Sequence, residues 1–319
     1  MNDHIQFLFA PMEGITFAMF RSIHHEMFPG AAEYYTPFIA PDSKGSFRTK
    51  YLKELTSDSG VRTIPQLLVN NPEAFNNTAL KFHELGFDEI NLNIGCPSGT
   101  VFSKHKGAGM LQDLSGLDRT LSSIFEQAEQ HSYRVSIKTR MGVHSTDEFS
   151  DILEIYNRYP VSSLIVHARC RDAFYKGQTD LSGFVSSMNK CQCPIVYNGN
   201  IFTKSDLYEI LSQAPKLSTV MLGRGAVTNP AVFRVFRGGS PLSPNELQVF
   251  HDRLTDAWLS SGLAPKFAVE RMKVLWTYWQ ALFPKTTKEL KAVWRARDLS
   301  MYRAAVSILF QSAANESWF

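Results

Sequence analysis

Several segments of the sequence place polar side chains and glycines directly after short apolar runs. Asn93 and Cys96 lie in an Asn-Ile-Gly-Cys-Pro-Ser segment, Lys138 begins Lys-Thr-Arg, and His167 begins His-Ala-Arg. Two later runs end in Asn-Gly-Asn and Gly-Arg-Gly. If the runs are neighbouring strands of a parallel barrel, these groups meet at one mouth. Amide, ammonium, imidazole and glycine-loop donors gathered there would suit a planar heteroaromatic ligand that carries a phosphate.

Each of these polar residues and glycines could bind one part of such a ligand at the mouth of the barrel. Gly199 and the segment 223–225 offer backbone N–H groups to a phosphate, and Arg224 adds a charged fork for the same anion. Lys138 and Gln66 can donate hydrogen bonds to the electron-rich edge of an isoalloxazine ring. A cation at that edge stabilises the reduced, anionic form of a flavin. The sequence therefore predicts a flavin site at the mouth of the barrel.

Cys96 is suited to acid chemistry. An unperturbed thiol has a pKa of about 8.5, so it is largely protonated at neutral pH and can protonate an enolate-like carbon. Taken alone, Cys96 is also consistent with a small buried hydrophobe, which is the commonest role of a cysteine. His167 and Gln66, taken alone, are consistent with hydrogen-bonded core groups. The functional prediction therefore rests on the convergence of these residues.

The elements that must position these groups follow from the spacing of apolar residues. Strands separated by helices indicate a parallel sheet with right-handed crossovers, and eight such units have the size of a TIM (β/α)8 barrel. A doubly wound open sheet is the alternative, and the lack of a G-x-G-x-x-G fingerprint after the first run counts against it. The expected strands are 5–10, 31–36, 62–68, 88–93, 134–139, 162–168, 193–198 and 218–223, with helical patterns at 72–86, 114–130 and 146–159.

The composition changes near residue 240. Residues 1–239 hold 23 Lys and Arg against 23 Asp and Glu, whereas residues 240–319 hold 10 against 7, with all five tryptophans. We therefore expect a barrel domain over 1–239 and a small all-helical domain over 240–319. A basic, aromatic-rich module suits a polyanionic partner. Composition alone fits an ordinary helical domain with a tryptophan core better.

Helix signals mark the last part of the chain. Ser243, followed by Pro and Glu at the first and third helical positions, predicts a capped helix that ends before Gly262. A second helix should follow Pro265. Thr286 repeats the capping pattern and should open a third helical region, broken near Asp298.

The totals limit the class of protein. No stretch approaches the ~20 apolar residues of a membrane span, and the N-terminus has no basic region of a signal peptide. We therefore expect a soluble, cytoplasmic protein, and a monomer. The four cysteines are too few and too irregularly spaced for a disulfide framework. Cys191 and Cys193 are similar to half of a metal site, but no third or fourth ligand is spaced nearby, so no metal is expected.

With these motifs the chain resembles the tRNA-dihydrouridine synthases over its whole length. The segment 93–98 is the most specific piece, and the Pro-Met-Glu-Gly segment at 11–14 and the Arg-Met-Lys at 271–273 are most similar to the bacterial C-type subfamily. The sequence differs from the common pattern of this family in two places, after the first expected strand and after the sixth. Glu13 and Phe17 stand where many members have Ala and Asp, and His-Ala-Arg-Cys at 167–170 replaces His-Gly-Arg-Thr.

The resemblance implies an FMN-holding TIM barrel followed by a helical RNA-binding domain. It implies that NADPH, or NADH, reduces the flavin, that hydride goes to C6 of a uridine in tRNA, and that Cys96 protonates C5. The uridine must be extruded from the folded tRNA into the mouth. The implied flavin contacts are Pro11, Met12, Glu13, Gln66, Lys138, His167, Asn198, Gly199, Asn200, Gly223 and Arg224, and the implied substrate or tRNA contacts are Asn93, Arg169, Arg271, Lys273 and Arg295.

Two other functions stay compatible with the residues alone. The same mouth would serve an FMN oxidoreductase that acts on a small pyrimidine or an enone. A catalytically silent RNA-binding protein would also carry the helical module. The first alternative predicts activity on a small substrate, and the second predicts that no bound flavin is bleached by a nicotinamide cofactor.

Overall fold

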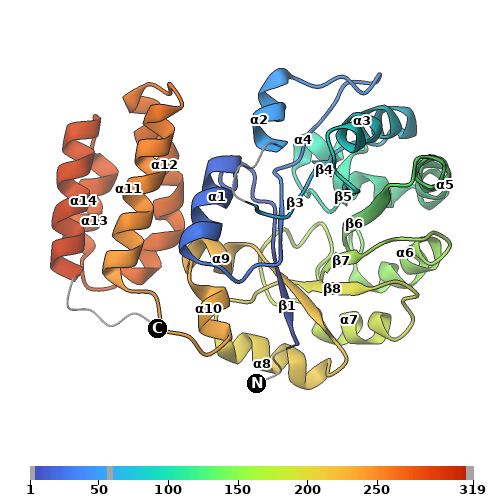
Figure 1. Cartoon of the computed structure of the whole chain (residues 1–319). Coiled ribbons are helices and arrows are strands. Elements are labelled where there is room, and N and C mark those ends of the chain that lie inside the picture. The colour runs from blue at the N-terminus through green and yellow to red at the C-terminus, as the bar shows by residue number, and fades with distance from the viewer. Residues whose placement is uncertain (1–3, 56–59, 314–319) are drawn as a thin grey trace.

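The computed structural model describes residues 4–55 and 60–313. Trp318, counted among the tryptophans above, lies outside these residues. A parallel barrel occupies the centre of the molecule, helices surround it, and the last helices pack against one side (Figure 1). The strands are β1 (Gln6–Phe9), β2 (Glu33–Tyr35), β3 (Thr63–Ile64), β4 (Gln66–Leu67), β5 (Glu89–Ile94), β6 (Arg134–Arg140), β7 (Leu164–His167), β8 (Ile195–Asn198) and β9 (Thr219–Leu222).

The strand segments of the described residues form an eight-stranded barrel, because β3 and β4 are two halves of one strand. Pro65, which has no N–H to donate, separates them. The order is β3-β2-β1-β9-β8-β7-β6-β5-β4, so the sheet begins and ends in the same strand. Asn91 N donates to the Pro65 carbonyl oxygen at 2.8 Å, which continues the pairing across the break. The predicted TIM barrel is confirmed, and each of the eight expected runs contains a strand.

The sequence of β5 explains how polar groups reach the barrel interior. All six of its residues are buried, and asparagines alternate with isoleucine and leucine along it. Successive side chains of a strand point to opposite faces. The apolar residues therefore pack against the surrounding helices, whereas Asn91 and Asn93 point into the barrel, toward Gln66 of the neighbouring β4.

The helices around the barrel follow the expected pattern. The predicted helices at 72–86 and 114–130 are α3 and α5, whereas the third begins with a 3-10 turn at Thr146–Glu148 before α6. Within residues 4–55 and 60–313, no helix has the length and apolar character needed to cross a bilayer. The helices are α1 (Ala18–Met27), α2 (Leu52–Leu55), α3 (Pro72–Glu84), α4 (Gly99–Phe102), α5 (Leu114–His131), α6 (Phe149–Tyr156), α7 (Leu181–Met188), α8 (Lys204–Gln213), α9 (Arg224–Thr228) and α10 (Val232–Phe236).

The C-terminal part is helical, as expected. It contains α11 (Pro244–Ser260), α12 (Pro265–Trp279), α13 (Thr287–Arg295) and α14 (Leu299–Ala313). Ser243 forms the predicted capping box with Glu246. Thr286 does not cap α13, although the helix begins there. The hydroxyl of Thr286 donates to the Phe283 carbonyl oxygen at 3.4 Å instead, because the chain enters α13 directly from a preceding turn.

The C-terminal helices pack directly on barrel elements. Trp279 of α12 is fully buried, and its Nε1 donates to the Val227 carbonyl oxygen of α9 at 2.9 Å. The rings of Phe250 on α11 and Phe20 on α1 meet edge to face, with centroids 5.5 Å apart. One cluster of buried apolar residues runs through both parts. The segment that follows β9 is therefore supported from behind by α12.

Candidate active site

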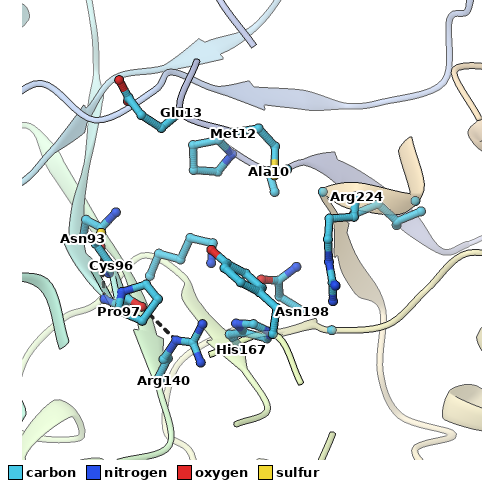
Figure 2. A pocket seen from close by; sticks show the side chains of 18 of the residues that line it. Ala10, Met12, Glu13, Asn93, Cys96, Pro97, Arg140, His167, Asn198 and Arg224 are labelled. Atoms are coloured by element: carbon cyan, nitrogen blue, oxygen red, sulfur yellow. Dashed lines mark hydrogen bonds between the residues drawn. The ribbon is translucent and has the colours of Figure 1, made fainter. Parts of the chain in front are cut away.

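A cavity opens at the carboxyl ends of the barrel strands. In Figure 2, Asn93 and Cys96 lie on one side of this cavity, Arg224 lies on the other, and Arg140 and His167 lie between them. The predicted residues that line it are Cys96, Asn93, Pro11, Met12, Glu13, Gln66, Lys138, His167, Asn198, Gly199, Asn200, Gly223 and Arg224. The structure thus brings together every predicted flavin contact and the predicted acid.

A directed chain of amides crosses the floor of the cavity. Asn93 Nδ2 donates to Gln66 Oε1 at 2.7 Å, and Gln66 Nε2 donates to Asn91 Oδ1 at 2.7 Å. Asn91 Nδ2 then donates to Ser136 Oγ at 3.0 Å. Buried amides must be hydrogen-bonded, because an unpaired one costs about 1–3 kcal/mol. This chain therefore fixes the orientation of each amide and leaves Gln66 at the cavity wall with a second N–H to offer.

Asn93 also holds the segment that carries the cysteine. Its Oδ1 accepts from the backbone N–H of Gly95 at 3.0 Å and of Cys96 at 2.5 Å. Gly107 packs behind this segment, and a Cβ there would lie 2.7 Å from the Cys96 carbonyl oxygen. The thiol is therefore held at a defined place on the rim of the cavity.

The Cys96 thiol is kept protonated at neutral pH. Partial burial raises its pKa, and Glu13 adds to this effect, while a backbone hydrogen bond, Arg140 and Lys138 act in the opposite direction. A thiol of this kind is a proton donor rather than a nucleophile, because the thiolate is the nucleophilic form. The two cations would stabilise the thiolate that remains after the proton has left.

The Lys138 amine has no oppositely charged side chain paired with it in the part of the chain that the structure describes. Among the described residues, no hydrogen bond or ion pair holds its Nζ, and its side chain is half-buried in the cavity wall. Loss of solvation and the charge of Arg140 together lower its pKa to about 7, while Cys96 acts weakly in the opposite direction. An anionic or electron-rich ligand in the cavity would reverse this shift, because an opposite charge favours the ammonium form.

His167 is a neutral hydrogen-bond donor toward the cavity. Arg169 Nη1 lies 3.0 Å from His167 Nε2, and a guanidinium can only donate, so the ring proton must lie on Nδ1. Burial holds the pKa of His167 well below its ordinary value, and the charges of Arg140 and Lys138 act in the same direction. The Nδ1–H group has no acceptor among the described residues and lines the cavity wall.

Arg169 itself does not line the cavity. It is 2% exposed, and its Nη2 donates to the Gly177 carbonyl oxygen at 2.6 Å. Its Nε donates to the Lys176 carbonyl oxygen at 3.3 Å. The predicted substrate contact is therefore a support for the loop between β7 and α7, because both carbonyl groups belong to that loop.

The other end of the cavity is formed by Arg224 and by glycine loops after β8 and β9. Arg224 Nη2 donates to Asn200 Oδ1 at 2.9 Å, which joins the loops after β8 and β9. These loops approach so closely that a Cβ on Gly225 would lie 2.0 Å from the Ile201 carbonyl oxygen. A Cβ on Gly199 would lie 2.6 Å from Thr179 Cγ2. The first backbone N–H groups of α9 have no acceptor within the helix, so a phosphate can take them.

Two polar side chains of the cavity, those of Arg140 and Tyr175, were not among the predicted site residues. Arg140 donates from Nε to the Gly95 carbonyl oxygen at 2.9 Å and from Nη1 to the Cys170 carbonyl oxygen at 2.9 Å. Burial lowers its pKa to about 10, so it remains charged at neutral pH. Its position two residues after Lys138 on β6 could have identified it, because such residues share a face. Tyr175 lies in a loop, and its type and spacing gave no such signal.

Arg171 joins the loop of Tyr175 to the segment of Cys96. Its Cζ lies 4.1 Å from the ring centroid of Phe102 on α4 and 5.0 Å from that of Phe174. Cation–π contacts of this kind contribute about 0.5–2 kcal/mol each. Arg171 therefore fixes the distance between the two loops that border the cysteine side of the cavity.

The three predicted C-terminal contacts with tRNA lie outside the cavity and differ from one another. Arg271 is exposed, and its Cζ lies 5.2 Å from the Phe17 ring and 5.7 Å from the Trp258 ring. Arg295 is also exposed. Lys273 Nζ donates to the Ala296 carbonyl oxygen at 2.8 Å and is mostly buried. Its ammonium group is therefore already engaged at the C-terminal end of α13, where it pairs with a backbone carbonyl group.

The donor set fits a flavin. Lys138 and His167 offer N–H groups that no other described residue accepts. The apolar side chain of Met12 packs beside Gly223 at the cavity wall. The glycine loops at the opposite end provide the anion site that a flavin phosphate needs. In the part of the chain that the structure describes, no group of three or more His, Cys, Asp or Glu side chains could hold a metal ion.

Comparison with known proteins gives a consistent result. The model of the dihydrouridine synthase family matches residues 8–288. A tRNA-dihydrouridine(16) synthase of Shigella flexneri is 27% identical over 252 residues, which is 74% of this chain and 77% of that protein. A probable tRNA-dihydrouridine synthase of Staphylococcus aureus (strain COL) is 28% identical over 240 residues, which is 71% of this chain and 70% of that protein.

Solved structures support the fold. Morphinone reductase covers 75% of this chain, with a TM-score of 0.51 and 12% identity, and 87% of its own length is matched. A variant of NCR from Zymomonas mobilis gives a TM-score of 0.52 at 14% identity, over 77% of this chain and 90% of that one. At these identities the likeness concerns the barrel architecture alone.

Proposed function

Because the chain belongs to the dihydrouridine synthase family, we propose that it reduces uridines in tRNA to 5,6-dihydrouridine with a bound flavin. The observation that carries the proposal is the convergence of Cys96, Lys138, His167 and the glycine loops on one cavity. Within the proposal, the flavin is FMN and the reductant is NADPH, with NADH as the other candidate. A bound flavin would supply the hydride for C6 of the uracil.

The chain's own residues have separate roles in holding that group. Gly199, Gly223 and Arg224 bind the phosphate, since they form the anion site. Lys138 and His167, with Gln66, donate hydrogen bonds to the ring, and Pro11 and Met12 pack against its face. Glu13, Asn198 and Asn200 complete the predicted contacts and border the same space.

Cys96 is the proposed acid of the reaction. Its raised pKa keeps the proton on Sγ at neutral pH. The S–H bond breaks as a C–H bond forms at C5 of the uracil, and the electron pair of the S–H bond stays on sulfur. Asn93 positions the cysteine through its backbone N–H and itself borders the cavity, so it can also contact the base.

The tRNA contacts are proposed on the helical part of the chain. We divide the chain into a catalytic domain, 1–239, and a tRNA-binding domain, 240–319. Arg271 and Arg295 are exposed cations of the second part, whereas Lys273 and Arg169 are engaged inside the protein. Exposed cations bind phosphates of the RNA backbone, and this contribution weakens as salt concentration rises.

The test compares tRNA from cells with and without this protein. Dihydrouridine should be missing from defined positions when the protein is absent, and the purified protein with FMN and NADPH should restore it. Position 16 is the first to examine, because relatives at 27% identity are named for it. If no position of the tRNA changes, the proposed substrate is excluded.

A Cys96→Ala variant tests the acid. We expect it to keep its flavin and its affinity for tRNA and to lose at least about 100-fold in rate, the usual contribution of general acid catalysis. Cys170→Ala is the matched control, because Cys170 is also half-buried and near the mouth but does not line the cavity. Equal rates for the two variants would contradict the role of Cys96.

The same preparation separates the alternatives. A small-molecule oxidoreductase would reduce free uridine or an enone as fast as tRNA, and a silent RNA-binding protein would show no flavin colour that NADPH bleaches. As part of the proposal the enzyme is a cytoplasmic monomer. Sedimentation analysis should then give a mass close to the 36.0 kDa of one chain.

A further inference from the structure

Cys191 and Cys193 form a pair of thiols far from the proposed active site. Their Sγ atoms lie 3.4 Å apart, and Cys191 Sγ also lies 3.4 Å from the Cys193 carbonyl oxygen. Both residues are half-buried and belong to the short turn between α7 and β8. β8 runs from this turn to the cavity, so the pair lies beyond the opposite end of the strand, roughly 16 Å from Asn198 at the rise of an extended chain.

The surroundings hold this turn in a fixed conformation. Asn157, just after α6, donates from Nδ2 to the Lys190 carbonyl oxygen at 3.0 Å and accepts from Gln192 N at 2.9 Å. Pro194 follows the pair and restricts the backbone of Cys193. The two thiols therefore meet because the fold places them together, and not because a mobile segment brings them close by chance.

The pair does not meet the requirement of a protein metal site. No third His, Cys, Asp or Glu side chain joins the two sulfurs in the described part of the chain. Structural zinc needs four such ligands. Two neighbouring thiols without further ligands are instead the reactants for a disulfide, which needs a sulfur–sulfur distance of about 2.05 Å.

We propose that Cys191 and Cys193 are a reversible oxidation site that forms a disulfide within this turn when the protein meets a peroxide. The Cys191 thiolate attacks one oxygen of the peroxide, the O–O bond breaks, and the products are a sulfenic acid and hydroxide. Cys193 then attacks the sulfenic sulfur, its proton passes to the departing oxygen, and water leaves. The two thiols are oxidised by two electrons and the peroxide is reduced by two. A dithiol reductant restores the thiols by exchange.

The electrostatics of the pair assign the first step to Cys191. A hydrogen bond from Cys193 lowers the pKa of Cys191, whereas the pKa of Cys193 is raised. Burial raises the pKa of Cys96, so its thiolate is scarcer at neutral pH. Because the thiolate is the form that peroxides oxidise, Cys191 should react before Cys96.

The test maps the oxidised cysteines in the full-length protein with its flavin bound. The protein is treated with one equivalent of hydrogen peroxide, free thiols are alkylated, and the chain is cleaved with trypsin. Cleavage after Lys190 and Lys204 releases residues 191–204, which contain both cysteines of the pair and no other. We expect this peptide to be unalkylated and lighter than the reduced peptide by the mass of two hydrogen atoms. A peptide alkylated at both cysteines, beside oxidised Cys96, would overturn the proposal.

A second measurement does not depend on peroxide. Alkylation of Cys191 by iodoacetamide is followed against pH in the natural protein and in Cys193→Ala. We expect the midpoint to move upward in the variant, with a rate at pH 7 that is roughly threefold lower, because a lower pKa gives more thiolate of lower intrinsic nucleophilicity. Cys170→Ala is the control and should leave the Cys191 profile unchanged. Identical profiles in all three proteins would show that the thiols only pack against the core.

Discussion

Lys138 should make flavin binding depend strongly on pH. Its pKa is about 7 in the free protein because burial disfavours the ammonium form. The electron-rich edge of a bound flavin ring accepts a charge-assisted hydrogen bond from the ammonium, which is stronger than a hydrogen bond from the neutral amine. Binding therefore requires a proton on Lys138, and the dissociation constant should rise once the pH exceeds 7. The variant Lys138→Met, which keeps the length of the stem, should lose this dependence.

The size of the effect follows from the pKa. At pH 9 about one free protein in a hundred carries the charged Lys138, so the dissociation constant should be about 100-fold higher than at pH 6, or about 2.7 kcal/mol. The second ionisation of the flavin phosphate, near pH 6, lies below this window. At pH 6 the Met variant should bind more weakly by about 1.5–3 kcal/mol, the usual contribution of a charged hydrogen bond. The two proteins should bind about equally at pH 9.

The assay is fluorescence titration of FMN into protein stripped of flavin, at pH values from 6 to 9. Melting of the stripped proteins gives an independent check. Folding depresses the pKa of Lys138, so the buried charge destabilises the fold below pH 7, and this cost fades as the pH rises toward 10.5. The Met variant should therefore melt higher than the natural protein at pH 6 and lose that advantage at high pH. A flat binding curve for the natural protein, or the same slope in both, would refute the argument.

Three further substitutions test other parts of the site. Arg171→Met should lower the melting temperature by the equivalent of about 1–2 kcal/mol, with partial rescue in Arg171→Lys; no change would remove the proposed link between the loops. Asn93→Ala leaves the half-buried N–H groups of Gly95 and Cys96 without their acceptor and should cost about 1–3 kcal/mol in urea unfolding. A neutral result would mean that water replaces the amide. Gly225→Ala should yield a folded protein without bound flavin, and therefore without colour, since the added methyl group clashes with the Ile201 carbonyl oxygen. A yellow protein, which retains its flavin, would show that the two loops can separate.

The barrel and most of its cavity could be predicted from the sequence because both depend on local patterns. Strand runs are recognised by their β-branched residues, and in a parallel barrel every strand ends at the same mouth. Knowing where each run ends was thus enough to place Lys138, His167 and Gly199 together. The break at Pro65 did not disturb this prediction, because the two halves of that strand stay in line.

The remaining features depend on contacts between distant parts of the chain. Tyr175 and Arg171 lie in a loop whose path has no periodic signal, so their proximity to Cys96 could not be predicted. Lys273 was predicted to contact tRNA from the surface. Its ammonium instead donates a hydrogen bond to the carbonyl oxygen of Ala296, 23 residues further along the chain. Thr286 has the sequence of a helix cap, but the preceding turn takes its hydroxyl. In each case a tertiary contact decided the role of a residue whose local sequence suggested another.

The contact between Trp279 and Val227 limits how the helical part can be studied. Removing α11–α14 would remove the indole of Trp279 and its neighbours from the segment that follows β9. The Val227 carbonyl oxygen would lose its hydrogen-bond donor, and a large apolar surface of the barrel would become exposed to solvent. A truncated protein would then aggregate, or fail to retain its flavin, for reasons unrelated to RNA. The contribution of these helices should be measured on the intact chain, by reversing the charge of exposed arginines one at a time.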